Sequence, residues 1–343
     1  MNDRALEGRV AVVAGATRGA GRGIACMLGA AGATVYCTGR SSTGSPSPMG
    51  RPETIEETAE LVVQHGGTAS AVRVDHTVEA DVVGLFERVR AEQGRLDILV
   101  NDVWGGDPLI DWNARFWEID VAAARALIDQ AVFSHLLTAR HGAPIMVEQG
   151  SGLIVEVTDG TFAGYRGQLL YDLVKSSVIR LGYAMAWDLV RTGVTALTVS
   201  PGFLRSEAVL AHFGVSEANW RDAIAKDPFF AESETPFLVG RGVAALAADP
   251  DVSRRAGTAV YAGELARAYG FTDVDGGLPD FFARLDLAVG EIVEREGPLV
   301  GQDRFLVWAR YLQLHRDPGQ REAATRLAER LSLTGVGAGL QPS

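Results

Sequence analysis

Short runs of apolar residues alternate with longer amphipathic stretches along most of the chain. Each run is long enough for one strand and is mainly apolar rather than alternating with polar residues, which is typical of strands buried between two layers of helices. Successive parallel strands need a crossover, usually a helix, between them, so the alternation predicts an α/β fold with a central parallel sheet of about seven strands. The predicted strands span residues 9–14, 34–38, 70–74, 96–100, 153–157, 194–200 and 258–262.

The amphipathic stretches between these runs predict helices, and the alternation ends near Asp280. We expect one α/β domain over residues 1–279 and a helical extension over residues 280–343. Apolar residues at helical spacing in that extension (Phe305, Trp308, Tyr311 and Leu312) must be buried somewhere. The extension then joins an oligomer interface, covers a pocket, or packs on its own subunit. The predicted helices span residues 22–31, 53–65, 81–93, 115–147 (one or two helices), 169–191, 236–248, 281–296 and 303–331.

The net charge of -11 argues against nucleic acid or an anionic membrane as a partner, because both require a basic face. No stretch offers about 18 uninterrupted apolar residues, so we expect no membrane span. Cys26 and Cys37 cannot form a disulfide framework, which favours a cytoplasmic protein. The six histidines show no ligand spacing, and we expect no metal site.

A glycine-rich run directly follows the first predicted strand and opens a helix. Glycines let the backbone turn sharply and approach a pyrophosphate, which the free N–H groups of a helix N-terminus bind. The position of the run predicts a dinucleotide site, although a tight turn in a glycine-rich chain is the alternative. The residues concerned are Gly15, Thr17, Arg18, Gly19, Ala20 and Gly21.

Arginine follows the second predicted strand, where an NAD site usually has an acidic residue for the ribose 2′-hydroxyl. Arg40 and Ser41 come directly after this strand, and Arg18 lies on the same side in the glycine run. Guanidinium groups and a hydroxyl suit a 2′-phosphate. We therefore expect NADP(H) in preference to NAD(H), unless Arg40 is only a solvated residue.

Only two of the 32 basic residues are lysines, and one of them, Lys175, lies four residues after Tyr171. Residues four apart share a helix face, and an ammonium beside a phenol lowers the pKa of the phenol. The pair predicts that Tyr171 is a general acid/base for a carbonyl/alcohol substrate, with Lys175 lowering its pKa. The alternative is two unrelated residues on a helix surface.

Together these motifs resemble the short-chain dehydrogenase/reductase family over residues 5–277. The family's glycine motif matches residues 14–21, and its active-site Tyr and Lys match Tyr171 and Lys175. The resemblance implies a doubly wound Rossmann fold, a small-molecule substrate, a homodimer or homotetramer, and a Lys175 that also holds the nicotinamide ribose. The runs at residues 104–106 and 270–276 are similar to one branch of the family. Further cofactor contacts implied by the resemblance are Asp75, His76, Asn101, Asp102, Val103, Pro201, Gly202, Phe203 and Ser206.

Two departures from the family pattern concern the substrate. Thr158 and Asp159 stand where the family has a Ser pair that binds the substrate oxygen, and Ala122 or Ala123 stands where we expect a water-holding Asn. Asp159 is then protonated and donates a hydrogen bond, or is ionised and favours a cationic substrate such as an iminium. Otherwise it points away, and Thr158 or Thr161 supplies the hydroxyl. We expect Asp159 in the pocket within reach of Tyr171.

Three functions follow from these residues. The first is NADP(H)-dependent carbonyl reduction or alcohol oxidation, with imine reduction as a variant. The second is an NADP-binding sensor or scaffold with weak or no turnover, favoured by the missing Ser and Asn. The third is an isomerase or dehydratase on the same fold. The aromatic segment 203–230, called the lid below, is expected to cover the substrate; ordinary core packing is the alternative.

Overall fold

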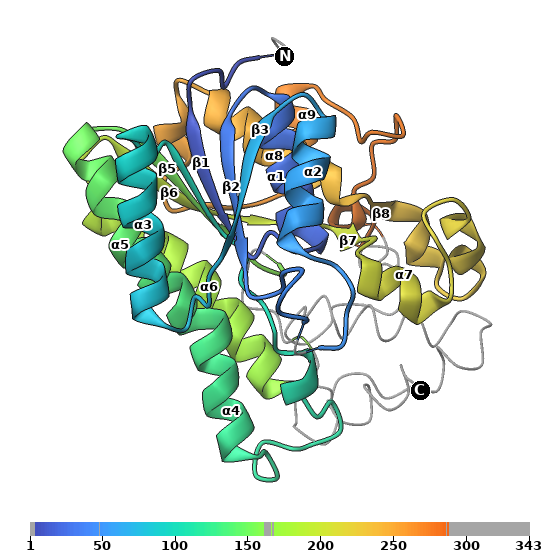
Figure 1. The fold of residues 1–343 in the computed structure, drawn as a ribbon. Coiled ribbons are helices and arrows are strands. Elements are labelled where there is room, and N and C mark those ends of the chain that lie inside the picture. Colours follow the sequence, from blue (N-terminus) through green and yellow to red (C-terminus); the bar gives the residue numbers. More distant parts are fainter. Residues whose placement is uncertain (1–3, 48, 161–165, 167, 286, 288–343) are drawn as a thin grey trace.

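A computed structural model describes residues 4–47, 49–160, 166, 168–285 and 287. Seven parallel strands form one sheet in the order β3-β2-β1-β4-β5-β6-β9 (Figure 1), which confirms the predicted doubly wound fold. The chain moves outward from β1 to β3 and then continues on the other side at β4, which creates a switch point at the carboxyl ends of β1 and β4. The strands are β1 (Val10–Ala14), β2 (Thr34–Gly39), β3 (Thr68–Arg73), β4 (Ile98–Asn101), β5 (Gly152–Val157), β6 (Val194–Ser200) and β9 (Ala259–Tyr261).

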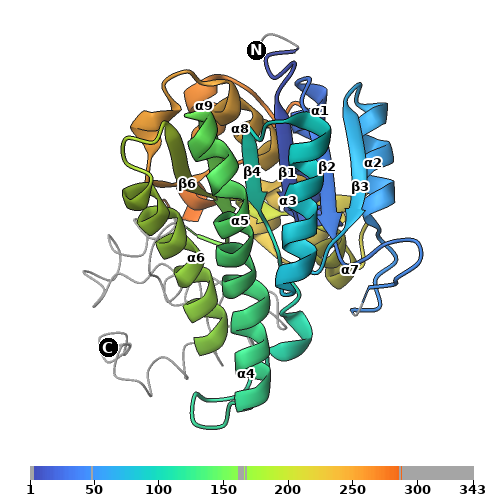
Figure 2. The same cartoon turned by 60° about the vertical axis from the view of Figure 1, so that its left-hand side comes forward.

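Helices cover both faces of the sheet, as the mainly apolar strands require. Their bounds are α1 (Gly19–Ala30), α2 (Ile55–Gln64), α3 (Glu79–Gln93), α4 (Val121–Ile128), α5 (Ser134–Gln149), α6 (Leu169–Asp188), α7 (Glu207–Phe213), α8 (Pro236–Ala248) and α9 (Ala262–Tyr269). Helices α1, α2, α8 and α9 lie on one face, and α3, α5 and α6 lie on the other (Figure 2). In the described residues, no helix is both long and apolar enough to cross a membrane.

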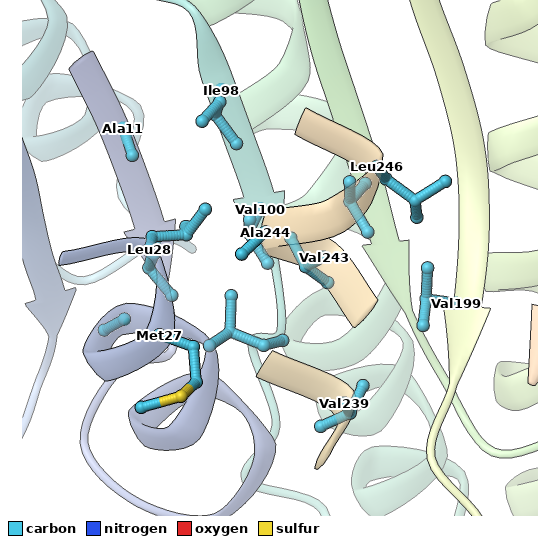
Figure 3. Packing of buried hydrophobic residues seen from close by; sticks show 14 of the residues in the cluster. Ala11, Met27, Leu28, Ile98, Val100, Val199, Val239, Val243, Ala244 and Leu246 are labelled. Carbon is cyan, nitrogen blue, oxygen red and sulfur yellow. The ribbon is translucent and has the colours of Figure 1, made fainter. Parts of the chain in front are cut away.

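The two faces of the sheet build two separate cores. Ala11 and Val13 of β1 belong to the core on the α1 and α8 side (Figure 3), whereas Val10 and Val12 belong to the core on the α3 and α5 side. All four are buried because consecutive strand residues point to opposite faces.

Helices α1 and α8 meet backbone to backbone. A Cβ added at Gly23 would lie 1.9 Å from the carbonyl oxygen of Pro236, and one added at Gly240 would lie 2.4 Å from that of Gly23. Only glycine therefore fits these two positions. The contact fixes α1, which carries the glycine run at its start, against the helix that follows the lid.

Several predicted bounds were wrong. Helix α1 begins at Gly19 rather than at residue 22, because the glycines of the run are already helical. The predicted helix over 115–147 is two α-helices, α4 and α5, joined by a π-helical turn at Asp129–Phe133, and residues 115–120 precede them. Helix α6 ends at Asp188, before the predicted residue 191.

The lid contains α7, two 3-10 turns (Trp220–Ala225 and Pro228–Glu232) and β7 (Phe203–Leu204), which pairs with β8 (Ser233–Glu234) in a small second sheet that the sequence did not predict. Arg205 holds this unit together from inside. Its guanidinium is buried, donates to the carbonyl oxygen of Ser233 at 2.6 Å and pairs with Glu217 at 2.8 Å.

The first residues after position 280 pack against the α/β unit. Phe282 stacks on Tyr261 with ring centroids 3.7 Å apart, and Phe281 and Leu285 join the same buried cluster as Phe229. A division at residue 279 stays a prediction, as does the role of the extension, since residues 288–343 lie outside the described residues. Residues 281–285 are helical, at the start of the predicted helix 281–296.

Candidate active site

One cavity of about 570 Å³ brings together most of the residues singled out from the sequence. The glycine run, the ends of β2, β4 and β5, the start of α6 and the Pro-Gly turn after β6 contribute to its wall. The predicted residues that line it are Gly15, Thr17, Arg18, Gly19, Ala20, Arg40, Ser41, Asp75, His76, Asp102, Val103, Thr158, Asp159, Tyr171, Lys175, Pro201, Gly202, Phe203 and Ser206.

Gly21 and Asn101 were predicted to contact the cofactor, but they lie behind the wall of the cavity. A Cβ at Gly21 would lie 2.3 Å from the carbonyl oxygen of Gly15, so this glycine allows the turn to close on itself. Asn101 is fully buried and donates to Oε1 of Glu156 at 2.7 Å. Both residues therefore support the site from inside rather than line it.

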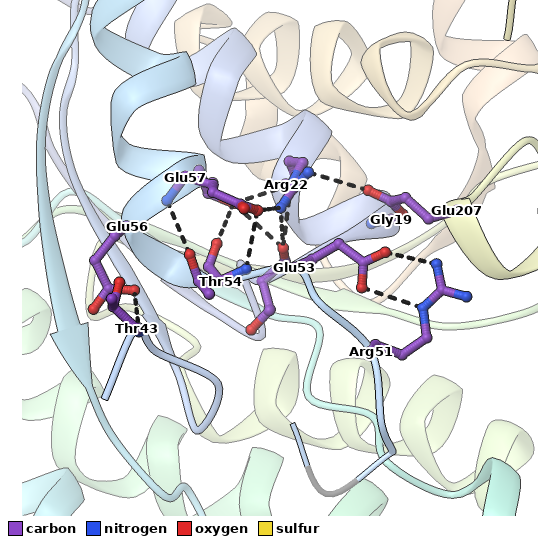
Figure 4. Close-up of polar contacts among 11 residues, drawn as sticks. Gly19, Arg22, Thr43, Arg51, Glu53, Thr54, Glu56, Glu57 and Glu207 are labelled. Atoms are coloured by element: carbon purple, nitrogen blue, oxygen red, sulfur yellow. Dashed lines mark hydrogen bonds and ion pairs between the residues drawn. The ribbon is translucent and has the colours of Figure 1, made fainter. Parts of the chain in front are cut away.

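The glycine run opens α1 without a side-chain cap from Arg18. Gly15 has a φ of +89°, and a Cβ there would lie 2.1 Å from the carbonyl oxygen of Asp102, so the turn requires glycine. The N–H of Gly19 donates to Oε2 of Glu207 at 2.9 Å, and Glu207 also pairs with Arg22 at 3.5 Å (Figure 4). A carboxylate from the lid thus already binds one of the free N–H groups of this helix N-terminus.

Arg40 lines the cavity at the end of β2, beside Asp75. Its guanidinium donates to Oε1 of Gln130 at 3.1 Å and lies 3.9 Å from Oδ2 of Asp75. His76 is buried between the hydroxyls of Thr38 and Thr138, each 2.8 Å from a ring nitrogen. Burial lowers the pKa of His76 to about 3, so this histidine is neutral.

Tyr171 and Asp159 meet at the reacting end of the cavity. The Tyr171 hydroxyl donates to Oδ2 of Asp159 at 2.9 Å, as expected for an Asp159 within reach. Burial raises the pKa of Tyr171 well above its ordinary value, and the charge and hydrogen bond of Asp159 raise it further. The net pKa of Tyr171 is therefore raised, whereas the sequence predicted that Lys175 would lower it, because burial and Asp159 dominate.

Lys175 lies over an indole ring instead of beside the phenol oxygen. Its Nζ is 4.0 Å from the centroid of the Trp104 ring and 5.4 Å from that of Tyr171. Burial lowers the pKa of Lys175, against the opposing charges of Asp159, Asp102 and Asp107. The ammonium is thus held by a π face and acidic neighbours.

Thr158 was one candidate to supply the missing hydroxyl. It is buried, and its Oγ1 donates to the carbonyl oxygen of Lys175 at 3.1 Å. Its proton is therefore already used by the backbone of α6. The other candidate, Thr161, lies outside the described residues.

Asp102 is a half-buried acid of the wall. It accepts a hydrogen bond from the N–H of Gly21, and burial raises its pKa to about 7 despite the cations Lys175, His135 and Arg18 nearby. This carboxyl joins the glycine run to the end of β4.

Sequence reasoning missed a buried group beneath the wall. His135 of α5 contacts Oε2 of Glu156 through Nδ1 at 2.6 Å and the carbonyl oxygen of Val103 through Nε2 at 3.1 Å. Burial favours neutral His135, but the charge and hydrogen bond of Glu156 prevail and its pKa is raised. The available signal was Glu156, an acid in the middle of an otherwise apolar strand.

The two residues expected to replace the family's Asn do not reach the cavity. Ala122 and Ala123 lie in α4 and are not part of the cavity wall. The residue of this region that reaches the wall is Gln130, in the π-helical turn. A π-helical turn shifts which side chains face inward, and its position is not visible in the apolar spacing.

Only part of the lid faces the cavity. Phe203, Leu204, Ser206, Ala208 and Val209 line it, whereas Trp220 and Phe230 pack on each other and Phe229 packs on Phe281. The alternative of core packing therefore holds for the second half of the lid. Phe281, Phe282 and Leu285 complete the apolar wall.

In the described part of the chain, no three His, Cys, Asp or Glu side chains are grouped as metal ligands. Cys26 and Cys37 are both free and buried.

Comparison with known proteins identifies the chain's relatives. A family model for short chain dehydrogenase matches residues 9–212. Dehydrogenase/reductase SDR family member 1 of Mus musculus is 36% identical over 284 residues, covering 81% of this chain and 87% of the mouse protein. The Homo sapiens protein of the same name is 35% identical over 276 residues, covering 79% and 85%. These two relatives confirm the resemblance to one branch that residues 104–106 and 270–276 predicted.

Solved structures agree in fold. A 7 alpha-hydroxysteroid dehydrogenase complexed with NADH and 7-oxo glycochenodeoxycholic acid matches with a TM-score of 0.62 and 23% identity, over 76% of this chain and 95% of that one. A hydroxysteroid dehydrogenase from Escherichia coli matches with a TM-score of 0.60 and 22% identity, over 76% and 98%. The matching family model and the two relatives above one-third identity show that this chain belongs to the short-chain dehydrogenase/reductase family and is a dehydrogenase or reductase.

Proposed function

We propose that the chain is an NADP(H)-dependent oxidoreductase that interconverts a C=O or C=N group and its reduced form by hydride transfer. The observation that carries this proposal is the placement of Tyr171 and Lys175 in one cavity with the glycine run. The substrate is a small molecule, because the cavity has a volume of about 570 Å³ and is bordered by part of the lid and by Phe281, Phe282 and Leu285.

The residues present fit a nicotinamide dinucleotide. The turn before α1 has glycine where the backbone passes close to other backbone, at Gly15 and Gly21. The N–H groups at the start of α1 suit phosphates. Arg40, Arg18 and Ser41 line the same wall and would hold a 2′-phosphate, which supports NADP(H) over NAD(H). When bound, the cofactor supplies or accepts the hydride.

Tyr171 and Asp159 would handle the proton that a carbonyl substrate requires. Tyr171 would give its hydroxyl proton to the substrate oxygen and take one back from water after the product leaves. Asp159, which accepts that hydroxyl at 2.9 Å, would orient it and disfavour a lasting phenolate beside the carboxylate. Lys175 contributes a positive charge to this end of the cavity.

A second candidate is an NADP-binding sensor or scaffold with little or no turnover. It is favoured by one observation: the Tyr171 hydroxyl is already used by Asp159, and its pKa is raised rather than lowered. Both properties make Tyr171 less effective as a general acid/base.

Replacement of Tyr171 by Phe separates the two candidates. We expect Tyr171→Phe to keep the Kd for NADPH and to lose about 10²-fold or more in kcat, the usual scale for an acid/base group. The matched control is Tyr183→Phe, on an exposed position of the same helix, which should keep wild-type kinetics. NADPH binding with no turnover of any carbonyl, alcohol or imine in a broad panel would instead establish the sensor.

We also propose a homodimer or homotetramer in the cytoplasm. Exposed apolar side chains on α5 and α6, such as Leu136, Leu173 and Trp187, support an interface between copies of the chain. Free, buried cysteines are compatible with a reducing compartment. Light scattering of the full chain tests the oligomer, and a monomer at micromolar concentration would contradict it.

A further inference from the structure

We propose that the reacting end of the cavity recognises a positively charged nitrogen, and that the substrate is an iminium ion or the protonated amine it forms. This inference rests on the proposed function and names its substrate class. It is carried by the charges, hydrogen-bond directions and aromatic rings around Tyr171.

Acidic groups predominate at this end. Asp159, Asp107 and Asp102 line the wall, and all three act on the charge of Lys175, the one ammonium among the described wall residues there. The other two cations of the described wall, Arg18 and Arg40, belong to the glycine run and to the end of β2. The buried guanidinium of Arg166 also acts on Tyr171 and Lys175, but it is paired with Asp172 at 3.1 Å. A cationic ligand would therefore meet more acidic groups than unpaired basic ones.

The hydrogen bonds also point the wrong way for a carbonyl oxygen, which needs donors. Tyr171 donates its proton to Asp159, and Thr158 donates its proton to the backbone of Lys175. An ionised carboxylate cannot donate, and it repels a developing alkoxide. An N–H⁺ group, by contrast, can donate to the free lone pairs of the Asp159 carboxylate and of the Tyr171 oxygen.

Aromatic rings surround the same point. The ring of Trp112 lies 5.1 Å from that of Tyr171, and the ring of Trp104 lies 5.8 Å from it. Rings and carboxylates together are the groups that bind organic cations in proteins. The ammonium of Lys175 over Trp104, at 4.0 Å, shows that this surface already binds one cation.

The remaining wall is apolar and defines the rest of the ligand. Phe203, Phe281, Phe282 and Leu285 lie along it. The ligand class that fits both parts is a charged nitrogen carried by a hydrophobic ring system.

Reduction of an iminium balances without a proton from the protein. The iminium carbon accepts the hydride that the reduced nicotinamide cofactor supplies, the C=N π pair becomes a lone pair on nitrogen, and a neutral amine results. Water then protonates the amine. Tyr171 can keep its proton and its hydrogen bond to Asp159 throughout, which is the arrangement observed.

Binding to the enzyme loaded with oxidised cofactor tests the inference without turnover. The probes are two bicyclic molecules of equal size, protonated 2-methyl-1,2,3,4-tetrahydroisoquinoline and neutral 1-tetralone, titrated by calorimetry. We expect the amine to bind at least about tenfold more tightly. Asp159→Asn should remove this preference, whereas Asp111→Asn, which removes an equal charge outside the cavity wall, should keep it.

Turnover provides the second arm. We expect kcat/KM for protonated 3,4-dihydroisoquinoline, an iminium ion that carries an N–H, to exceed that for 1-tetralone by about tenfold or more, after subtraction of the uncatalysed rate. Equal or tighter binding of the ketone, or an Asp159→Asn variant with an unchanged amine preference, would overturn the inference. In that case efficient ketone reduction would leave the proposed function intact. An amine preference in binding with no turnover of either probe would support the cation site and contradict the oxidoreductase.

Discussion

Asp102 should make cofactor affinity depend on pH. Its carboxyl contacts the glycine run that would hold the cofactor's phosphates, and burial raises its pKa from 3.8 to about 7. Below pH 7 the side chain is a neutral acid, and above pH 7 it is an anion that repels phosphate. If binding requires the neutral form, each binding event above pH 7 takes up one proton. The Kd for NADPH then rises by up to about tenfold per pH unit.

The variant Asp102→Asn keeps the shape of the side chain and cannot ionise. We would measure the Kd for NADPH by fluorescence for both proteins between about pH 6.5 and 9. The ratio of the wild-type Kd to the Kd of Asp102→Asn should grow by up to about 100-fold over the two units above pH 7, which corresponds to about 2.7 kcal/mol. The charge of Asp102 acts on Lys175 as well, so the ratio reports the whole pH-dependent effect of this carboxyl on binding. Parallel plots of log Kd against pH would refute the reasoning.

Three further predictions concern the cofactor, stability and packing. NADPH should bind at least about tenfold more tightly than NADH, and Arg40→Asp should narrow or reverse this difference; equal Kd values in the wild type would contradict the proposed 2′-phosphate contact. Glu234 has a pKa raised by burial from 4.5 to about 8, so the folded state holds its proton longer and stability falls as pH rises between these values. In the wild type, the free energy of unfolding measured in urea should fall by about 1.4 kcal/mol per pH unit over this range, and in Glu234→Gln this fall should be absent. The same pH dependence in both proteins would count against this role of Glu234. Gly23→Ala should cost about 3 kcal/mol or more, because its Cβ would lie 1.9 Å from the Pro236 carbonyl oxygen; an unchanged unfolding midpoint would disprove that the backbones touch.

The fold was predictable because its signals are local. An apolar run such as residues 194–200 can only be a strand covered on both faces, and β6 has these bounds. Helix ends were less predictable, since Gly19 and Gly21 are poor helix formers that the turn nevertheless places inside α1. The π-helical turn in the stretch 115–147 could not be predicted, because the spacing of the apolar residues does not reveal it.

The members of the site were predictable from motifs, but their electrostatics were not. Tyr171 and Lys175 share a helix by their spacing, yet the pKa of Tyr171 depends on Asp159, which arrives from the loop after β5. The sequence left open whether that carboxylate lies in the pocket or points away from it, and only the loop geometry places it in the pocket. The group of His135 and Glu156 joins residues from α5 and β5, which no short motif connects.

The backbone contact between α1 and α8 also limits how a substrate can enter. Since Gly23 and Gly240 leave no space between these helices, the two ends of the lid cannot separate: β6 is part of the sheet, and α8 is fixed to α1. The segment between them is fixed at both ends. The pairing of β7 with β8 and the buried Arg205 make it rigid near those ends. The lid can therefore move away from the cavity only if the backbone bends within residues 206–232. The space available for substrate entry then depends on the flexibility of that segment and not on a hinge between domains.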